Sequence, residues 1–538
     1  MAKKTPQINI GLASLMIAAI TSLSLPAQQV ASRPSLVVGI VVDGLTMDNI
    51  DQLRSYFSDS GFNRLLNDGV TVTDLNYQST LDPTAATAII MTGASPAVNG
   101  IDSGEKYDIS TRRAVSVFSD PSIIGNYTNE TYSPTILKTS TIGDEIRIAT
   151  GGLGHVYSIA PNHGQAIVMA GHAGNSGFWI NKANGKWATT TFYKDVPTVI
   201  QTLNYRNSLE SRLDTMVWTS TIKPEKYPDL PKHRKLYSFR HTFYSSEPDR
   251  FNRFVSSPLA NREVTNIASD YIRQLNLGKS ENMDMLNIAY TLSPYPYGKD
   301  ADNRMEVMDS YIRLDADLTK LFKAIESGPG MDNTLIFLTG TPAIPFSRKE
   351  DEKWALATGE FSPRRAISLL NMYLIALHGN GEWVTGYHNN QIFLNRDLIK
   401  SHDIDLKKIR TNAAEFLVRM EGVSAASSID DVLNSARHSI PVEPHNINLE
   451  HAGDVYVAVL PGWEIIDDGT TNPSPVTYPL AVRIVAPIAP GFILYPQLKA
   501  QRITTPVDAR AIAPTVSSLS RIRAPNAATQ PPLRLEKK

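Results

Sequence analysis

The chain has 538 residues, a formal net charge of −1 and a hydrophobic fraction of 42%. The near balance of basic and acidic residues argues against nucleic acid or an anionic membrane surface as a partner. The length suffices for one large core or about two or three domains. The chain contains no cysteine, which excludes disulfides and a lipid-modified cysteine.

The first 27 residues have the pattern of a secretory signal peptide. Lys3 and Lys4 precede an apolar run from Ile8 to Leu25, and Ala27 ends a candidate cleavage site. We expect residues 1–27 to be removed and the mature protein to be periplasmic; an uncleaved N-terminal anchor is the alternative. No other run approaches the roughly 20 apolar residues of a membrane span.

The stretch Leu36–Gly44, LVVGIVVDG, organises the rest of the chain. Its unbroken apolar run predicts a strand buried on both faces, as in a parallel sheet covered by helices. Binding sites in such sheets lie at the carboxyl ends of the strands, which is where Asp43 falls. Asp43 is therefore a candidate metal ligand or base, although it could also only cap the following turn.

The patterns that follow alternate between helix and strand. Helices are expected at residues 61–68, from Asp82-Pro83 to Gly93, at 142–149, at 264–275, and where apolar residues recur from Tyr311 to Ile325. Strands are expected at residues 166–170, 186–192, 285–290 and 334–339, with a glycine-rich turn at 171–179. This alternation predicts an α/β fold with a parallel sheet.

Residues 364–426 depart from the preceding alternation of strands and helices. A helix at 366–377, a hairpin over 383–394, a helix at 409–420 and a strand at 423–425 suggest a small α+β subdomain inserted in the main sheet. Further strands are then expected at 454–460 and 480–486. A last helix is expected at 514–522, and the Pro-rich tail, 527–538, is expected to be loose at its end.

Several landmarks in this order resemble one enzyme family. They are VVGIVVDG (37–44), MTGASPAVNGI (91–101), STIGDEIRIAT (140–150), AGHAGNSGFW (170–179), EVMDSYIRLDADL (306–318), TLIFLT (334–339), DVYVAVLPGW (454–463), GTTN (469–472) and IAPTVSSL (512–519). Together they resemble the nucleotide pyrophosphatase/phosphodiesterase branch of the alkaline phosphatase superfamily, in particular the periplasmic, phosphate-irrepressible alkaline phosphatases with a threonine nucleophile. The resemblance covers the chain from Leu36 to Asn526.

The resemblance implies a three-layer α/β/α sandwich with a mainly parallel sheet over residues 33–526, interrupted by the inserted subdomain. It also implies a site with two zinc ions held by carboxylates and imidazoles. The first ligand position is retained as Asp43. The other ligand positions fall on Thr291, Tyr295, Thr341, Pro342 and Asn472. If this register is right, Asp43, Thr291, Thr341 and Asn472 should lie around one pocket.

The substrate-binding positions differ from the family pattern as well. The nucleophilic threonine falls on Pro83, and a shift of one residue offers Thr84 as a residual candidate. The phosphate-binding asparagine falls on Gly104. The family's Lys-x-Arg pair falls on Asn162 and Gly164, which flank His163.

These substitutions favour a catalytically inactive pseudophosphatase. Neutral hydroxyl, phenol and amide groups cannot offset the dehydration of Zn²⁺ as carboxylates and imidazoles do. We therefore expect no catalytic residues and no cofactor, with Asp43 as a lone, vacant metal ligand. The protein would then act in binding or scaffolding, with an envelope protein or a small anionic ligand as its partner. The alternative is a metal-dependent phosphomonoesterase or phosphodiesterase that uses Thr84 and Asp43, and a third possibility is a purely structural subunit of an envelope complex.

The histidines give weaker signals. His163 could bind an anion when protonated, but a solvated loop histidine is the simpler expectation. His172 belongs to the shared AGH turn and is interpreted as structural. His388, His445 and His451 have no carboxylate at ligand spacing, which disfavours a relocated zinc site.

Overall fold

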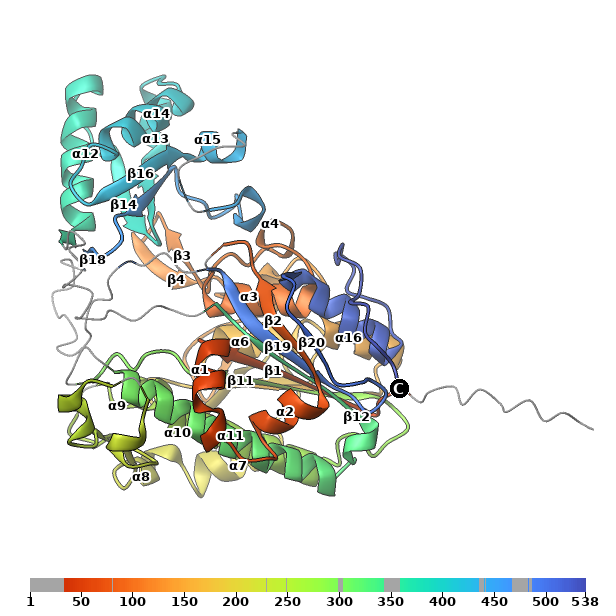
Figure 1. Ribbon diagram of the computed structural model, residues 1–538. Coiled ribbons are helices and arrows are strands. Elements are labelled where there is room, and N and C mark those ends of the chain that lie inside the picture. The colour runs from red at the N-terminus through yellow and green to blue at the C-terminus, as the bar shows by residue number, and fades with distance from the viewer. Residues whose placement is uncertain are drawn as a thin grey trace, which may run out of the picture. The chain divides into compact units, whose positions relative to one another are not determined.

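The computed structural model describes residues 33–538 except 80, 229, 248, 299–302, 343–358, 435–439, 441, 467–481 and 483–485 (Figure 1). Its centre is β1, Leu36–Asp43, which pairs in parallel with β11, Asp284–Thr291, and with β12, Thr334–Gly340. Every residue of β1 is buried, as the apolar run predicts. The predicted signal peptide, residues 1–27, lies outside the described residues.

The described strands of the main sheet run in the order β20-β2-β19-β12-β1-β11-β6-β7-β8-β5. Within the stretch β12-β1-β11-β6-β7 adjacent strands are parallel, whereas β19 is antiparallel to both β12 and β2, and β8 is antiparallel to β7. The remaining bounds are β2 Val70–Asn76, β5 Gly125–Asn126, β6 Val156–Ile159, β7 Ser176–Ile180, β8 Trp187–Thr190, β19 Ile488–Leu494, β20 Gln501–Ile503 and β21 Val507–Asp508.

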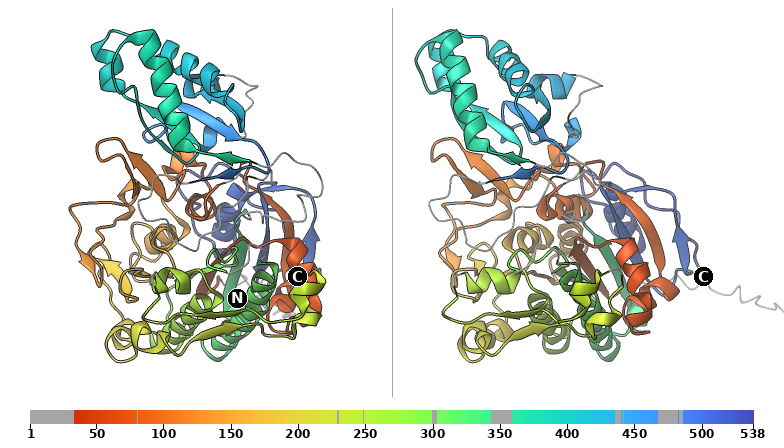
Figure 2. Two further views of the ribbon diagram at one scale, coloured as in Figure 1. Left: turned by 90° about the vertical axis from the view of Figure 1, so that its left-hand side faces the viewer. Right: turned by 60° about the vertical axis from the view of Figure 1, so that its left-hand side comes forward.

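Helices cover both faces of this sheet, so the predicted α/β/α sandwich is confirmed. On β1, Val38, Ile40 and Val42 belong to one core cluster and Val37 and Val41 to another, because alternate side chains point to opposite faces. The first cluster includes residues of α1 Met47–Leu53, α2 Phe62–Asp68, α10 Pro258–Gln274 and α11 Arg304–Ser327. The second includes residues of α3 Pro83–Thr92, α5 Ile142–Ala149, α6 His163–Ala170 and α16 Ile512–Ser520. Figure 2 shows the long helices α10 and α11, yellow-green and green, side by side.

Helix α3 begins where the sequence predicts. The Asp82 carboxylate accepts a hydrogen bond of 2.8 Å from the Ala85 backbone amide, and Pro83 occupies the first helical turn. Gly93 ends the helix with φ = +66°, a conformation that favours glycine.

The expected strand at residues 166–170 is instead the end of helix α6. All its residues from Gly164 to Ala170 are buried, so no polar face marks the helical period. An apolar run of this length fits a buried strand and a buried helix equally well. The neighbouring glycine-rich stretch, expected as a turn, contains strand β7.

The inserted subdomain has its own sheet in the order β14-β15-β17-β16. Its strands are β14 Val384–His388, β15 Gln391–Leu394, β16 Val423–Ser428 and β17 Val455–Val459, and its helices include α12 Pro363–His378, α13 Arg396–Ser401 and α14 Leu406–Leu417. The strand expected at 454–460 is β17, and it pairs with β15 and β16 of the subdomain. Asp454, just before β17, accepts hydrogen bonds from the Leu394 amide and from Arg396 and Arg410, which bind it to the subdomain. The subdomain thus reaches beyond residue 426. The expected strand at 480–486 falls mostly outside the described residues.

The C-terminal tail is not loose. The Leu533 amide donates to Thr515 Oγ1 over 2.8 Å, and the Lys538 amide donates to the Gln497 carbonyl over 2.9 Å. Leu533 and Leu535 also pack on the second core cluster, and this apolar contact explains why the tail docks.

Short elements complete the description. They are α4 Pro96–Asn99, β3 Glu105–Asp108, β4 Arg113–Ser116, α7 Thr198–Tyr205, α8 Leu209–Leu213, β9 Val217–Thr219, β10 Arg240–Thr242, α9 Arg250–Val255, β13 Glu360–Phe361, α15 Ile429–Asn434 and β18 Glu464–Ile465. Within the described part of the chain, no helix combines the length and apolar character needed to cross a membrane.

Candidate functional site

Three of the positions expected to share a pocket meet at the carboxyl ends of neighbouring strands. Asp43 is the register partner of Thr291 at the ends of β1 and β11. Thr341 directly follows β12, and its hydroxyl lies 3.3 Å from Asp43 Oδ1. Asn472 lies outside the described residues. Asp43, Thr291 and Thr341 therefore lie together at one edge of the sheet.

Asp43 is buried and bonded to neutral groups. Gln165 of α6 donates from Nε2 to Asp43 Oδ1 over 3.0 Å, and the same nitrogen lies 3.4 Å from Thr87 Oγ1. Burial raises the pKa of Asp43 to about 7, because the hydrogen bonds from Gln165 and Thr341 offset only part of the desolvation. Sequence reasoning missed Gln165, since the helix that carries it reads as a strand.

Tyr295 fills its position with an aromatic ring. It is buried, and its ring lies 5.2 Å from that of Trp218 and 4.6 Å from that of His241. Burial raises its pKa to about 12, so the phenol stays neutral at physiological pH. Pro342, beside Thr341, is buried and has no side-chain donor atom.

Thr84 lies beside Gly104 and Gly164, two positions to which the family resemblance assigns phosphate contacts. A Cβ atom added to Gly104 would lie 2.9 Å from Thr84 Oγ1, and one added to Gly164 would lie 2.6 Å from it. Both distances are too short for a real contact, so the long side chains implied by the family pattern do not fit here unless Thr84 moves. Pro83, at the start of α3, offers no hydroxyl.

His163 is not a solvated loop histidine. It is the first residue of α6, with Asn162 as the N-cap, and its ring stacks on Tyr132 at a centroid distance of 4.5 Å. Its Nε2 lies 3.0 Å from Ser116 Oγ. Burial, with a smaller contribution from Lys182, lowers its pKa to about 4. The ring is therefore neutral at pH 7 and supplies no cation for an anion.

The other histidines do not build a metal site within the described residues. His172 contacts Asp144 Oδ2 at 3.4 Å and the Leu137 carbonyl at 2.9 Å, which fits its structural interpretation. His388 and His451 line a common pocket, but His445 does not line it. In the described ranges no three histidine or carboxylate side chains form a group able to hold a metal ion.

The described residues at the strand ends do not fit a pair of zinc ions. Asp43 is the only carboxylate among the described ligand positions, and its Oδ1 already accepts hydrogen bonds from Gln165 and Thr341. Thr291, Tyr295 and Pro342 supply a hydroxyl, a phenol and no donor respectively. Zinc sites in proteins are built from thiolate, imidazole and carboxylate ligands.

Comparisons with known proteins agree with this fold. Residues 37–479 match the type I phosphodiesterase / nucleotide pyrophosphatase family. The chain is similar to alkaline phosphatase PhoV of Synechococcus elongatus, with 27% identity over 93% of this chain and 92% of that protein. It is also similar to alkaline phosphatase PafA of Elizabethkingia meningoseptica, with 25% identity over 93% of this chain and 94% of PafA.

A solved structure has the same fold. The crystal structure of wild-type PafA aligns with a TM-score of 0.79 at 23% identity, over 93% of this chain and 98% of that one. At this identity the likeness concerns the fold alone.

Proposed function

The chain belongs to the type I phosphodiesterase / nucleotide pyrophosphatase family, and from that premise we propose that it is a catalytically inactive member, a pseudophosphatase. It is exported to the periplasm through residues 1–27 and acts by binding rather than by hydrolysis. Its partner is an envelope protein or a small anionic ligand. No zinc ion or other cofactor takes part.

The state of Asp43 carries this proposal. A carboxylate that serves a cation must be ionised and have an oxygen free to coordinate. Here burial raises the pKa of Asp43 to about 7, and the carboxyl accepts hydrogen bonds from Gln165 and Thr341. The side chains of Gln165 and Thr341 thus stand where a coordinated cation would otherwise neutralise the carboxylate. Both hydrogen bonds reach Oδ1, so the protein itself satisfies that oxygen, and the raised pKa disfavours the ionised form that a cation needs.

One observation favours the alternative, a phosphoesterase that uses Thr84 and Asp43. The Thr84 hydroxyl lies next to Gly104 and Gly164, the positions that the family pattern assigns to phosphate contacts, at the start of helix α3. A helix N-terminus presents backbone amides that suit an anion. An activity assay decides between the two functions.

We predict no turnover of phosphate monoesters or diesters above that of the Asp43→Ala variant. Loss of one stabilising group commonly costs about 10²–10³-fold in rate, and here the nucleophile, the cationic groups and most metal ligands are replaced together. The assay compares the parent, Asp43→Ala and Thr84→Ala, purified identically from a phosphatase-deficient host, with and without added zinc. Equal background in all three is expected. Zinc-dependent hydrolysis in the parent that disappears in both variants would refute the proposal and identify Thr84 as the nucleophile.

We further predict well under one zinc ion per chain in protein purified without added metal. With one carboxylate and neutral neighbours, no tight site couples metal binding to folding, so added zinc should barely raise the melting temperature. Elemental analysis and thermal unfolding with zinc or a chelator measure both quantities. Stoichiometric zinc that survives the chelator would contradict the prediction.

A further inference from the structure

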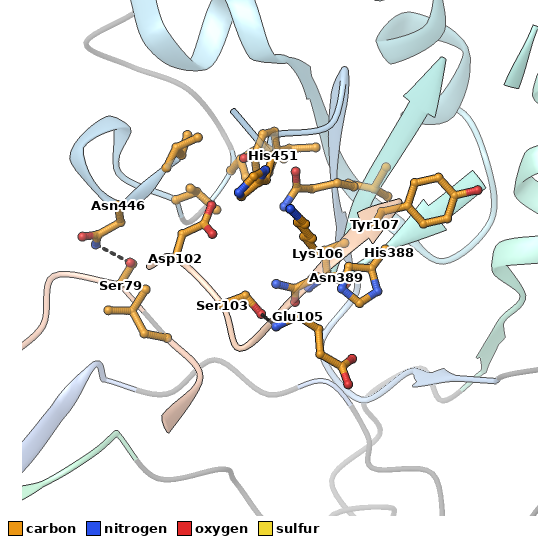
Figure 3. A pocket seen from close by; sticks show the side chains of 18 of the residues that line it. Ser79, Asp102, Ser103, Glu105, Lys106, Tyr107, His388, Asn389, Asn446 and His451 are labelled. Carbon is orange, nitrogen blue, oxygen red and sulfur yellow. Dashed lines mark hydrogen bonds between the residues drawn. The ribbon is translucent and has the colours of Figure 1, made fainter. Parts of the chain in front are cut away.

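A pocket with a cavity of about 150 Å³ lies between the main domain and the inserted subdomain (Figure 3). On one side it is lined by the segment around Ser103 and strand β3, and on the other by the β14–β15 turn and residues near β17. Neither Asp43, Thr291 nor Thr341 lines it. The pocket is therefore a site separate from the strand-end cluster.

Two opposite charges line this pocket without meeting. Asp102 and Lys106 belong to the same segment of chain, and in the view of Figure 3 they flank His451. Neither forms an ion pair with any described residue closer than 4.0 Å. Asp102 Oδ2 accepts a hydrogen bond of 2.9 Å from the Asn448 amide. Burial raises the pKa of Asp102 to about 6, as expected for a carboxyl that lacks a cationic partner.

Two imidazoles add unused hydrogen-bonding capacity. His388 and His451 both line the pocket, and the Nε2 atom of each is shielded from solvent without a hydrogen-bond partner among the described residues. Shielded polar atoms in proteins nearly always have a partner, so each of these two nitrogens has a hydrogen bond still to make. Burial lowers the pKa of His451, which keeps its ring neutral.

We propose that this pocket binds a small zwitterion, a molecule with an ammonium group and a carboxylate separated by a short chain, as in an amino acid. The ammonium group pairs with Asp102, and the carboxylate pairs with Lys106 and accepts a hydrogen bond from an imidazole. A simple anion would leave the half-buried Asp102 unpaired and lie close to its charge, and a simple cation would do the same at Lys106. Only a ligand with both charges satisfies both residues.

The inference rests on the proposed binding role and puts a zwitterion in the place of the small anionic ligand named there. The zwitterion proposal and the pseudophosphatase proposal can be refuted independently, because ligand binding in this pocket is measured without any hydrolysis assay. The site is also independent of zinc, since the pocket includes none of the strand-end positions named above.

Calorimetric titration of the full mature protein tests the proposal. Glycine, β-alanine and γ-aminobutyrate are the zwitterionic probes and differ only in the chain between their charges. Propylamine and propionate carry one charge each. We expect at least one zwitterion to bind at least about tenfold more tightly than either single-charge probe. No zwitterion binding up to 10 mM, or equal binding of propionate, would overturn the proposal.

Matched variants locate the binding site. Asp102→Asn and Lys106→Met remove one charge each at nearly constant size, and each should weaken zwitterion binding at least about tenfold. Asp59→Asn and Lys279→Met make the same changes at exposed positions outside the pocket and should leave binding intact. Unliganded melting temperatures verify that the variants fold. Unchanged affinity in both pocket variants would place binding elsewhere and refute the assignment. The comparison of zwitterionic and single-charge probes uses the parent protein alone, so it still tests the ligand class if a variant does not fold.

Discussion

At pH 8 the Asp43→Asn variant is expected to be more stable than the parent protein by about 1–3 kcal/mol. The reason is the buried carboxyl, whose pKa is raised from 3.8 to about 7 on folding. A raised pKa means that the folded protein resists ionisation that the unfolded chain accepts freely. Since each pKa unit corresponds to about 1.36 kcal/mol, the rise of about three pKa units limits the stability difference to about 4 kcal/mol. In the variant an NH2 group replaces Oδ2, and no described residue accepts a hydrogen bond from it there. This unpaired donor reduces the gain in stability below the ceiling.

The stability advantage of Asp43→Asn over the parent should increase as the pH rises. Below about pH 4 the carboxyl is protonated in both the folded and the unfolded states, so Asp43 carries no ionisation penalty. Between about pH 4 and pH 7 the unfolded chain ionises first, and the parent loses stability as the pH rises. Above pH 7 the loss is complete. Asparagine does not titrate, so its advantage should be present at pH 8 and absent at pH 4.

Urea unfolding of both proteins at several pH values measures this difference, with Asp59→Asn as an exposed control that should show no such trend. The result also bears on function, because removal of a true metal ligand destabilises the metal-bound protein. A variant less stable than the parent at pH 8, with the loss abolished by a chelator, would mean that Asp43 serves a metal after all.

The sequence predicted the centre of the fold because its signals there are local and unambiguous. The apolar run that ends at Asp43 is rich in β-branched residues and so favours a buried strand, and Asp82-Pro83 specifies a helix start through a cap and a fixed φ angle. Helix α6 was mistaken for a strand because it is buried all round and so loses its amphipathic period. That error also hid Gln165, the residue that satisfies Asp43.

The remaining features depend on contacts between distant segments. The pocket joins Asp102 and Lys106 to His388 and His451, which are far apart in the sequence, and no local pattern links them. Strand β17 reads as a strand from its residues alone, but its partner is set by Asp454 and the arginines around it. His163 reads as a loop residue because its burial comes from Tyr132, on another segment.

Asp309 is a fully buried carboxylate whose loss should cost several kcal/mol of stability, about 3–5 kcal/mol. Its side chain is fully buried and accepts hydrogen bonds from Trp218 Nε1 over 2.7 Å, from the Tyr227 hydroxyl over 2.8 Å and from Arg313 Nε over 2.6 Å. The Thr221 amide donates to it as well. One carboxylate of α11 thus fixes the segment that carries β9 to the long helix.

Replacement of Asp309 by alanine is therefore expected to destabilise the protein by about 3–5 kcal/mol, because it leaves Arg313 without its partner and several buried donors unpaired. The effect should extend to Tyr295, a position to which the family resemblance assigns a metal ligand, because Trp218 packs against it. Urea unfolding measures the loss, and near-ultraviolet circular dichroism reports whether the aromatic cluster keeps its fixed arrangement. Asp59→Ala, the same change at an exposed position, should cost less than about 0.5 kcal/mol. A loss at Asp309 below about 1 kcal/mol, with an unchanged aromatic spectrum, would show that water replaces the carboxylate and that the segment is held by packing alone.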